Sequence, residues 1–97
     1  SSLVIPGPLI YVEAGVRYEG QVLSCMGFDE AVASWVQMGL SVESSTASGT
    51  GATAVLRAPH DRPEMLGWAA DAVARALSAC GYTGVVQIRA RFAHAPA

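Results

Sequence analysis

The fold is decided first by one stretch, Asp61-Arg62-Pro63-Glu64, which runs on as MLGWAADAVARALSAC to Gly81. Asp61 stands where a helix N-cap belongs, with a proline soon after it and a glutamate three residues on, so the spacing predicts a capping box. Gly81 predicts the end of the helix. The apolar positions recur every three or four residues: Leu66, Ala69, Ala70, Val73, Leu77 and Cys80. The stretch therefore predicts an amphipathic helix, with Asp71 and Arg75 as an i,i+4 ion pair on its outer side.

Strand patterns lie on both sides of this helix. The segments Ala52–Ala58 and Val85–Phe92 alternate apolar with polar or charged residues, which is the period of a half-buried strand. Leu40–Ser48 predicts a more polar strand, with Val42 as its surest core residue. The glycine-containing turn Ser48–Gly51 joins it to the next strand, so the two strands are expected to form a hairpin.

The first part of the chain holds one more strand pattern and one more helix pattern. The alternation from Leu9 to Leu23 predicts one long strand, or a hairpin, with Gly15 or Gly20 marking a bulge or a turn. This long strand can also serve as a sheet edge for pairing with another copy. From Gly27 to Met38 the period becomes helical, and the expected core stripe is Phe28, Ala31, Val32, Trp35, Val36 and Gly39.

The elements follow the order strand, helix, strand, strand, helix, strand. This order predicts an α+β two-layer sandwich, a four-stranded antiparallel sheet with both helices on one face. It resembles ferredoxin-like folds, β-α-β-β-α-β, a resemblance of topology that implies no function. Acylphosphatases share the topology, but their activity needs an asparagine, which this chain lacks. Residues 1–97 are expected to form a single domain, with 1–8 an irregular lead-in and 93–97 a frayed tail.

Composition excludes several classes of protein. The chain is 52% hydrophobic and 14% charged, with two cysteines and a net charge of −2, which argues against disorder, a disulfide scaffold and nucleic-acid binding. No apolar run is long enough for a transmembrane helix, and the start is no signal peptide. The absence of lysine and asparagine indicates a GC-rich, bacterial source. We expect a cytoplasmic protein in which Cys25 and Cys80 are buried free thiols.

Arginines gather on one predicted surface. If the helices cover one face of the sheet, the other face carries four of the six arginines: Arg17, Arg57, Arg89 and Arg91. One interpretation is a solvated surface with cross-strand ion pairs, to which Glu13 and Glu19 contribute. The other is a ligand-binding face, because a guanidinium can bind a carboxylate or phosphate through two parallel hydrogen bonds. The outward positions of the last two strands hold no aromatic residue for base stacking, so nucleic acid is not an expected partner.

The second helix supplies a candidate interface. Trp68 lies off its apolar stripe, close to Arg75, and an exposed tryptophan is typical of protein interfaces. The alternative is that Trp68 packs against a loop or the first helix. No metal or cofactor is expected: His60 and His94 lack clustered cysteines or carboxylates, and Ser45–Gly51 lacks the lysine of a phosphate-binding loop.

Two hypotheses about function follow. The favoured one is a non-catalytic protein-interaction or regulatory module that self-associates, as a homodimer, or docks onto a larger protein. The alternative is a small enzyme or ligand-binding protein whose arginine-rich sheet face holds an anionic ligand, with Glu13 or Glu19 as acid or base. A close arrangement of glutamate and arginine in a concave site would favour the alternative, and a flat surface would favour the module.

Overall fold

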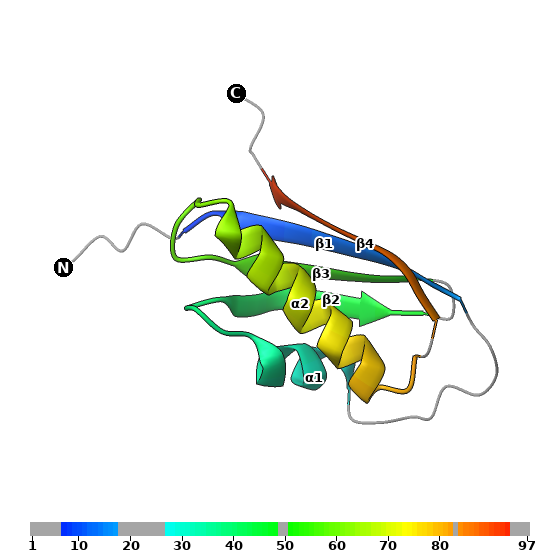
Figure 1. The fold of residues 1–97 in the computed structure, drawn as a ribbon. Helices are drawn as coiled ribbons and strands as arrows, with labels where there is room; N and C mark the ends of the chain where they lie inside the picture. The colour runs from blue at the N-terminus through cyan, green and yellow to red at the C-terminus, as the bar shows by residue number, and fades with distance from the viewer. Residues whose placement is uncertain (1–6, 18–26, 49–50, 83, 94–97) are drawn as a thin grey trace.

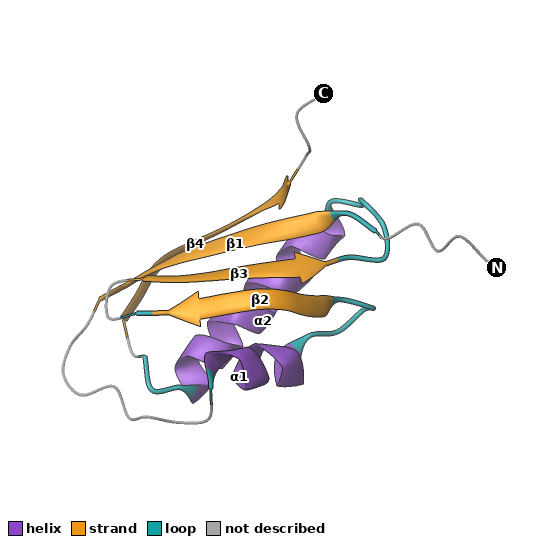
Figure 2. Ribbon diagram, turned by 180° about the vertical axis from the view of Figure 1, so that it is seen from behind, coloured by secondary structure: helices purple, strands orange, loops and turns teal. Residues whose placement is uncertain are grey.

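The computed structural model describes residues 7–17, 27–48, 51–82 and 84–93, with the backbone alone at Val16, Arg17, Val85 and Val86. The elements are β1 (Leu9–Arg17), α1 (Phe28–Trp35), β2 (Ser41–Ala47), β3 (Gly51–Arg57), α2 (Glu64–Ala79) and β4 (Gly84–Ala93). The strands form one antiparallel sheet in the order β2-β3-β1-β4. Both helices lie against the same face of this sheet (Figures 1 and 2). The predicted α+β fold, a four-stranded antiparallel sheet with two helices, is confirmed.

β1 lies inside the sheet, paired with β3 along one side and with β4 along the other. The expectation that the first strand serves as an edge is therefore wrong, and the outer strands are β2 and β4. The physical reason is the apolar row on β1, because Ile10 and Val12 are fully buried and need neighbouring strands on both sides. The rest of the predicted long strand, residues 18–23, lies outside the described residues.

The core lies between the helices and the inner face of the sheet. Strand alternation places Ile10 of β1 beside Leu56 of β3 and Phe92 of β4, and Val12 beside Ala54 and Ala90. The other face, which the helices leave uncovered, is called the open face below. The alternations predicted for β3 and β4 are confirmed, since Ala54 and Leu56 are buried, Ile88, Ala90 and Phe92 pack against the core, and Gln87, Arg89 and Arg91 are exposed.

Figure 1 shows α2 running diagonally across the sheet, and most of its predicted features are present. Gly81 ends it with a φ of +90°, a conformation that costs glycine little. The buried stripe is Met65, Ala69, Ala72, Val73, Ala76 and Leu77. The prediction missed Met65, Ala72 and Ala76 and gave Leu66 and Ala70, which are partly buried, so the helix is rotated slightly from the expected phase.

The predicted capping box at Asp61 is wrong. α2 begins at Glu64 behind Pro63, whose own φ of −56° and ψ of −29° are helical, and no side chain caps it. The first turn is instead closed by the backbone, because the Met65 N–H bonds to the Arg62 carbonyl at 3.0 Å. In the loop before it, His60 Nδ1 accepts a hydrogen bond from the Arg62 N–H at 3.3 Å. The proline starts the helix without help from Asp61.

α1 is shorter than the predicted range Gly27–Met38, and Trp35 is not in the core. Val36 is extended, and Met38 and Gly39 follow with φ of +58° and +82°, which turn the chain toward β2. Ala31 and Val32 are the buried residues of this helix. Trp35 falls in the last turn and stays 37% exposed. The Ser45 hydroxyl donates to the Asp29 carboxylate and so ties β2 to α1.

Two irregularities and one close approach shape the sheet. The β1–β4 register shifts between Gly15 and Val16, so the bulge predicted near Gly15 is present, and Gly20 lies outside the described residues. The β2–β3 register shifts between Val42 and Ser44, and Val42 is partly buried. Gly7 lies so close to the end of β3 that a Cβ there would stand 1.7 Å from the Ala58 carbonyl oxygen.

Cys80 is buried and is not in a disulfide, as predicted, and Cys25 lies outside the described residues. Neither of the two described helices is both long and apolar enough to cross a membrane.

Stability should depend on the α2 stripe and not on Asp61. Leu77→Ala removes a fully buried side chain and should lower the free energy of unfolding by about 2–5 kcal/mol. Asp61→Ala removes an exposed carboxylate that caps nothing and should change it by less than about 0.5 kcal/mol. Urea denaturation followed by circular dichroism measures both. A loss of 1 kcal/mol or more, on the order expected for a lost cap, in Asp61→Ala would contradict the described helix start.

Candidate functional site

The candidate interface residues Trp68 and Arg75 both lie on the outer side of α2. Arg75 Nε donates to Asp71 Oδ2 at 2.8 Å, so the predicted i,i+4 ion pair is present. The Arg75 guanidinium also lies over the Trp35 ring of α1, 5.3 Å from its centroid. Trp68 is 36% exposed and lies two helical turns before Arg75, so of the two interpretations of this residue the exposed one fits the structure. These four residues, Trp35, Trp68, Asp71 and Arg75, are called the α2 surface below.

The α2 surface presents side chains that carry binding energy at many protein interfaces. Tryptophan and arginine are the residue types most enriched among interface hot spots. Arg75 is held from two sides, by the Asp71 carboxylate and the Trp35 ring, so fixing it in a complex costs less conformational entropy. Sequence reasoning missed Trp35, because helical spacing alone placed it in the core stripe and could not show that α1 ends at that residue.

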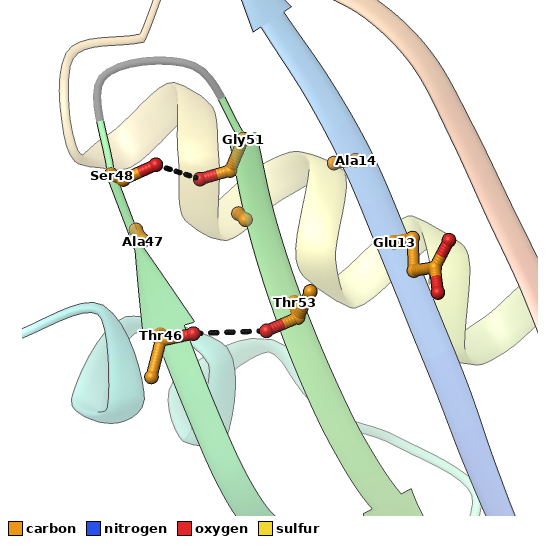
Figure 3. Close-up of a pocket in the computed structure, with 8 residues that line it drawn as sticks. Glu13, Ala14, Thr46, Ala47, Ser48, Gly51 and Thr53 are labelled. Carbon is orange, nitrogen blue, oxygen red and sulfur yellow. Dashed lines mark hydrogen bonds between the residues drawn. The ribbon is translucent and has the colours of Figure 1, made fainter.

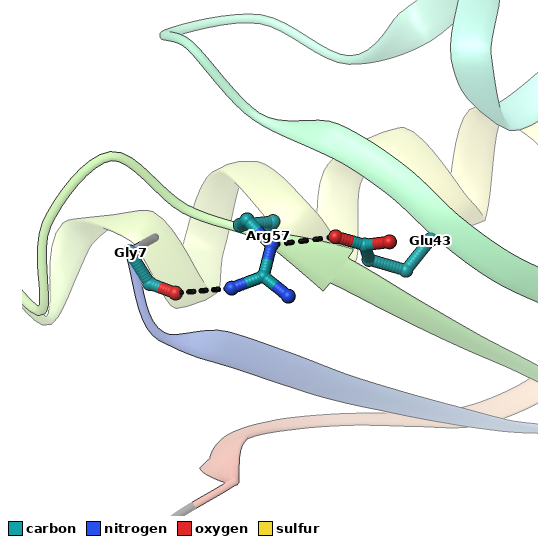
Figure 4. Close-up of polar contacts among 3 residues, drawn as sticks. All are labelled: Gly7, Glu43 and Arg57. Atoms are coloured by element: carbon teal, nitrogen blue, oxygen red, sulfur yellow. Dashed lines mark hydrogen bonds and ion pairs between the residues drawn. The ribbon is translucent and has the colours of Figure 1, made fainter. Parts of the chain in front are cut away.

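The three candidate arginines whose side chains the structure describes, Arg57, Arg89 and Arg91, have separate partners. Arg57 Nε donates to Glu43 Oε1 at 2.5 Å, and Arg57 Nη1 donates to the Gly7 carbonyl at 2.7 Å (Figure 4). The β2–β3 register shift brings Glu43 to Arg57, because Glu43 is the extra residue of that strand. Arg57 therefore fastens the chain before β1 to β3. Its contacts are structural, although the residue stays partly exposed.

Arg89 and Arg91 lie next to each other on the outer part of the open face. The Gln87 amide, in the orientation that satisfies its hydrogen bonds, accepts from Arg89 Nε at 2.8 Å and from Arg89 Nη2 at 3.2 Å. The Arg91 guanidinium lies over the Tyr11 ring, 5.4 Å from its centroid. Arg17 ends β1 opposite Gly84, and the prediction for its side chain lies outside what the structure describes. The described arginines thus do not converge on one anion site.

Tyr11 is a residue of the open face that sequence reasoning missed. It is 39% exposed and lies between the buried Ile10 and Val12, which is the signal that could have placed it outward. The expectation of an open face without aromatic rings rested on the last two strands, whereas Tyr11 lies on β1. Among the described residues, the open face therefore carries the aromatic ring of Tyr11, with the Arg91 guanidinium beside it.

The open face is hollowed on both sides of β1. One hollow, of about 360 Å³, lies between β1 and the β2–β3 hairpin and is lined by Glu13, Thr46, Gly51 and Thr53, among others (Figure 3). The second, of about 240 Å³, is lined by Glu13, Ala14, Gly15, Gln87 and Arg89. Glu13 and Arg89 are directly opposite each other on β1 and β4. A glutamate and an arginine thus line one concave site, the arrangement expected of the ligand-binding alternative, although no ion pair joins the two described side chains.

Other candidates from the sequence stay unremarkable in the fold. No group of three histidine, cysteine, aspartate or glutamate side chains gathers anywhere in the described ranges. The Ser48 hydroxyl bonds to the Gly51 carbonyl at 3.1 Å, and the Tyr82 hydroxyl bonds to the Ser48 carbonyl at 2.9 Å. These contacts tie the hairpin end to the chain after α2. Cys25 and His94 lie outside the described residues.

Comparison of the chain with protein-family models, with curated proteins and with solved structures finds no match. The function must therefore be inferred from the residues and their geometry.

Arg57 should contribute to stability more than its neighbours on the open face. Arg57→Met removes two charge-assisted hydrogen bonds at a site that is one-third exposed, 33% at the side chain, so we expect a loss of about 1 kcal/mol. Arg91→Met keeps an apolar contact with Tyr11 and should change the free energy of unfolding by less than about 0.5 kcal/mol. If urea denaturation gives the same change in unfolding free energy for both substitutions, the hydrogen bonds of Arg57 to Glu43 and Gly7 add no stability.

Proposed function

We propose that this chain is a non-catalytic interaction module that forms a homodimer through the α2 surface. The observation that supports it best is the state of Arg75, which is ion-paired with Asp71 and stacked on Trp35 while remaining 53% exposed at its side chain. A charged group held in a fixed position on a surface with two exposed tryptophans is suited to binding. It also has no evident role in the core.

The α2 surface is complementary to itself. A two-fold axis at the middle of α2, between Asp71 and Ala72, would pair two antiparallel helices. Trp68 would then face Arg75 of the partner subunit, because both residues are equally far from the axis. Each guanidinium could lie against an indole of the other subunit while keeping its own Asp71, so neither carboxylate would be left unpaired. Such an isologous contact supports a second copy as the partner.

We also propose that the chain has a ferredoxin-like topology. α1 joins β1 to β2, which run parallel with β3 between them, and α2 joins β3 to β4, which run parallel with β1 between them. Two interleaved β-α-β units of this kind characterise that topology. The topology carries no function by itself. The bacterial source and the cytoplasmic location stay predictions, because no contact in the fold bears on them.

The dimer proposal is tested by two substitutions on the α2 surface. Trp68→Ala and Arg75→Ala should each raise the dimer dissociation constant at least about thirtyfold, since a hot-spot truncation costs about 2 kcal/mol or more and a symmetric interface loses the residue twice. Analytical ultracentrifugation over a range of concentrations measures it. Met38→Ala is the matched control, because Met38 is 56% exposed and lies outside the α2 surface.

Three results would count against the dimer. One is a chain that stays monomeric at every concentration. Another is a dimer that Trp68→Ala leaves unchanged. The third is an equal effect of Met38→Ala, which would indicate nonspecific association of exposed apolar side chains. Circular dichroism of each variant shows whether the fold is retained, so a loss of association can be separated from a loss of folding.

A further inference from the structure

Two opposite charges on the open face stand unpaired across neighbouring strands. Glu13 of β1 and Arg89 of β4 are direct partners in the register, and residues so placed have Cβ atoms about 5 Å apart. Within the described residues no ion pair joins them, and no hydrogen bond engages the Glu13 carboxylate. Gln87 accepts from Nε and Nη2 of Arg89, which fixes the guanidinium and leaves its Nη1–Nη2 end for another acceptor.

The sheet surface beside Glu13 and Arg89 carries no side chains at two paired positions, because both residues are glycines. Gly15 of β1 lies opposite Gly51 of β3 in the register, one row from Glu13. A Cβ added at Gly15 would meet nothing within 4 Å, so the absence of a side chain leaves real space. The hollows of about 360 and 240 Å³ lie on the two sides of β1 and share Glu13 and Ala14 as lining residues.

Two threonine hydroxyl groups lie at the β2–β3 side of the larger hollow. Thr46 of β2 and Thr53 of β3 share a hydrogen bond of 2.9 Å between their hydroxyl oxygens (Figure 3). The hydroxyl that accepts in this pair keeps its own proton, which it can donate to a ligand. Thr53 lies in the same register row as Glu13, and Glu13 in the same row as Arg89. The row therefore presents in order a hydroxyl, a carboxylate and a guanidinium.

We propose that this hollow binds a small zwitterion, a free α-amino acid with a short polar side chain. The ammonium group would lie on Glu13 and the carboxylate on the free end of Arg89, which suits the parallel bonds that a guanidinium makes with a carboxylate. The side chain would extend over Gly15 and Gly51 toward Thr53. This site goes beyond the proposed dimer, because Glu13 alternates with the buried Val12 and Ala14 and so lies on the side of the sheet opposite to α2.

The charge pattern selects a zwitterion over simpler ions. An inorganic anion would gain from Arg89 and lose to Glu13, and a cation would gain from Glu13 and lose to Arg89. Only a ligand that carries both signs on neighbouring atoms gains from both residues. Because the site is open to water, we expect weak binding, with a dissociation constant on the order of 1 mM.

The test uses L-serine as the probe and amide NMR shifts of the isotopically labelled chain as the readout. We expect the shifts to gather at Glu13, Gly15, Gly51 and Arg89. N-acetyl-L-serine lacks the ammonium group and L-serinamide lacks the carboxylate, so each should bind at least about tenfold more weakly. Glu13→Gln and Arg89→Gln should weaken L-serine binding by a similar factor. Trp68→Ala should bind as the native chain does, whatever its effect on the dimer.

Gly15→Val gives the sharpest variant. The valine side chain would occupy the hollow without touching neighbouring atoms through its Cβ, and a β-branched residue suits a strand. The fold should therefore be retained while binding is lost. Gly67→Ala is the matched control, because a Cβ there also meets nothing and the residue lies in α2, away from the open face. The proposal is overturned if the folded Gly15→Val chain binds L-serine normally. Equal binding of the three probes, or shifts at other residues, would overturn it as well.

Discussion

The pairing of β1 with strands on both sides is the constraint on which the rest of the structure depends. Ile10 and Val12 are fully buried under the helix layer. Their strand lies between β3 on one side and β4 on the other. A strand shows alternate residues to opposite faces, so burying this row turns Tyr11 and Glu13 to the open face. A register slip of one residue would exchange the two sets, and the core would then have to bury a glutamate.

Both proposed binding surfaces follow from that arrangement. On the helix side, the sheet fixes α2 through Val73 and Leu77, and the opposite side of the helix is left with Trp68 and Arg75. On the open face, the register places Glu13 opposite Arg89. The glycines at positions 15 and 51, which are paired with each other, leave the neighbouring sheet surface without side chains. The two surfaces lie on opposite layers, so a partner on one does not need to displace a ligand on the other.

Much of the fold could be predicted from the sequence, and the failures have physical causes. All six elements and the inward faces of β3 and β4 follow from local periodicity. The strand order, and so the central place of β1, depends on long-range pairing that periodicity does not report. Asp61 failed as a cap because Pro63 is already helical, and Trp35 stays exposed because α1 ends at that residue. For the site, the exposed Trp68 and the Asp71–Arg75 pair were predictable, whereas the partners of Arg57 and Arg89 depend on register.

The central position of β1 is tested most directly by cross-strand NMR contacts between backbone protons. The account predicts that Val12 shows contacts with Ala54 on one side and with Ala90 on the other, in one register from Leu9 to Gly15 along both neighbours. Contacts to one neighbour alone would contradict it. So would a register displaced by one residue, because Glu13 would then face the helices and neither surface described above would exist.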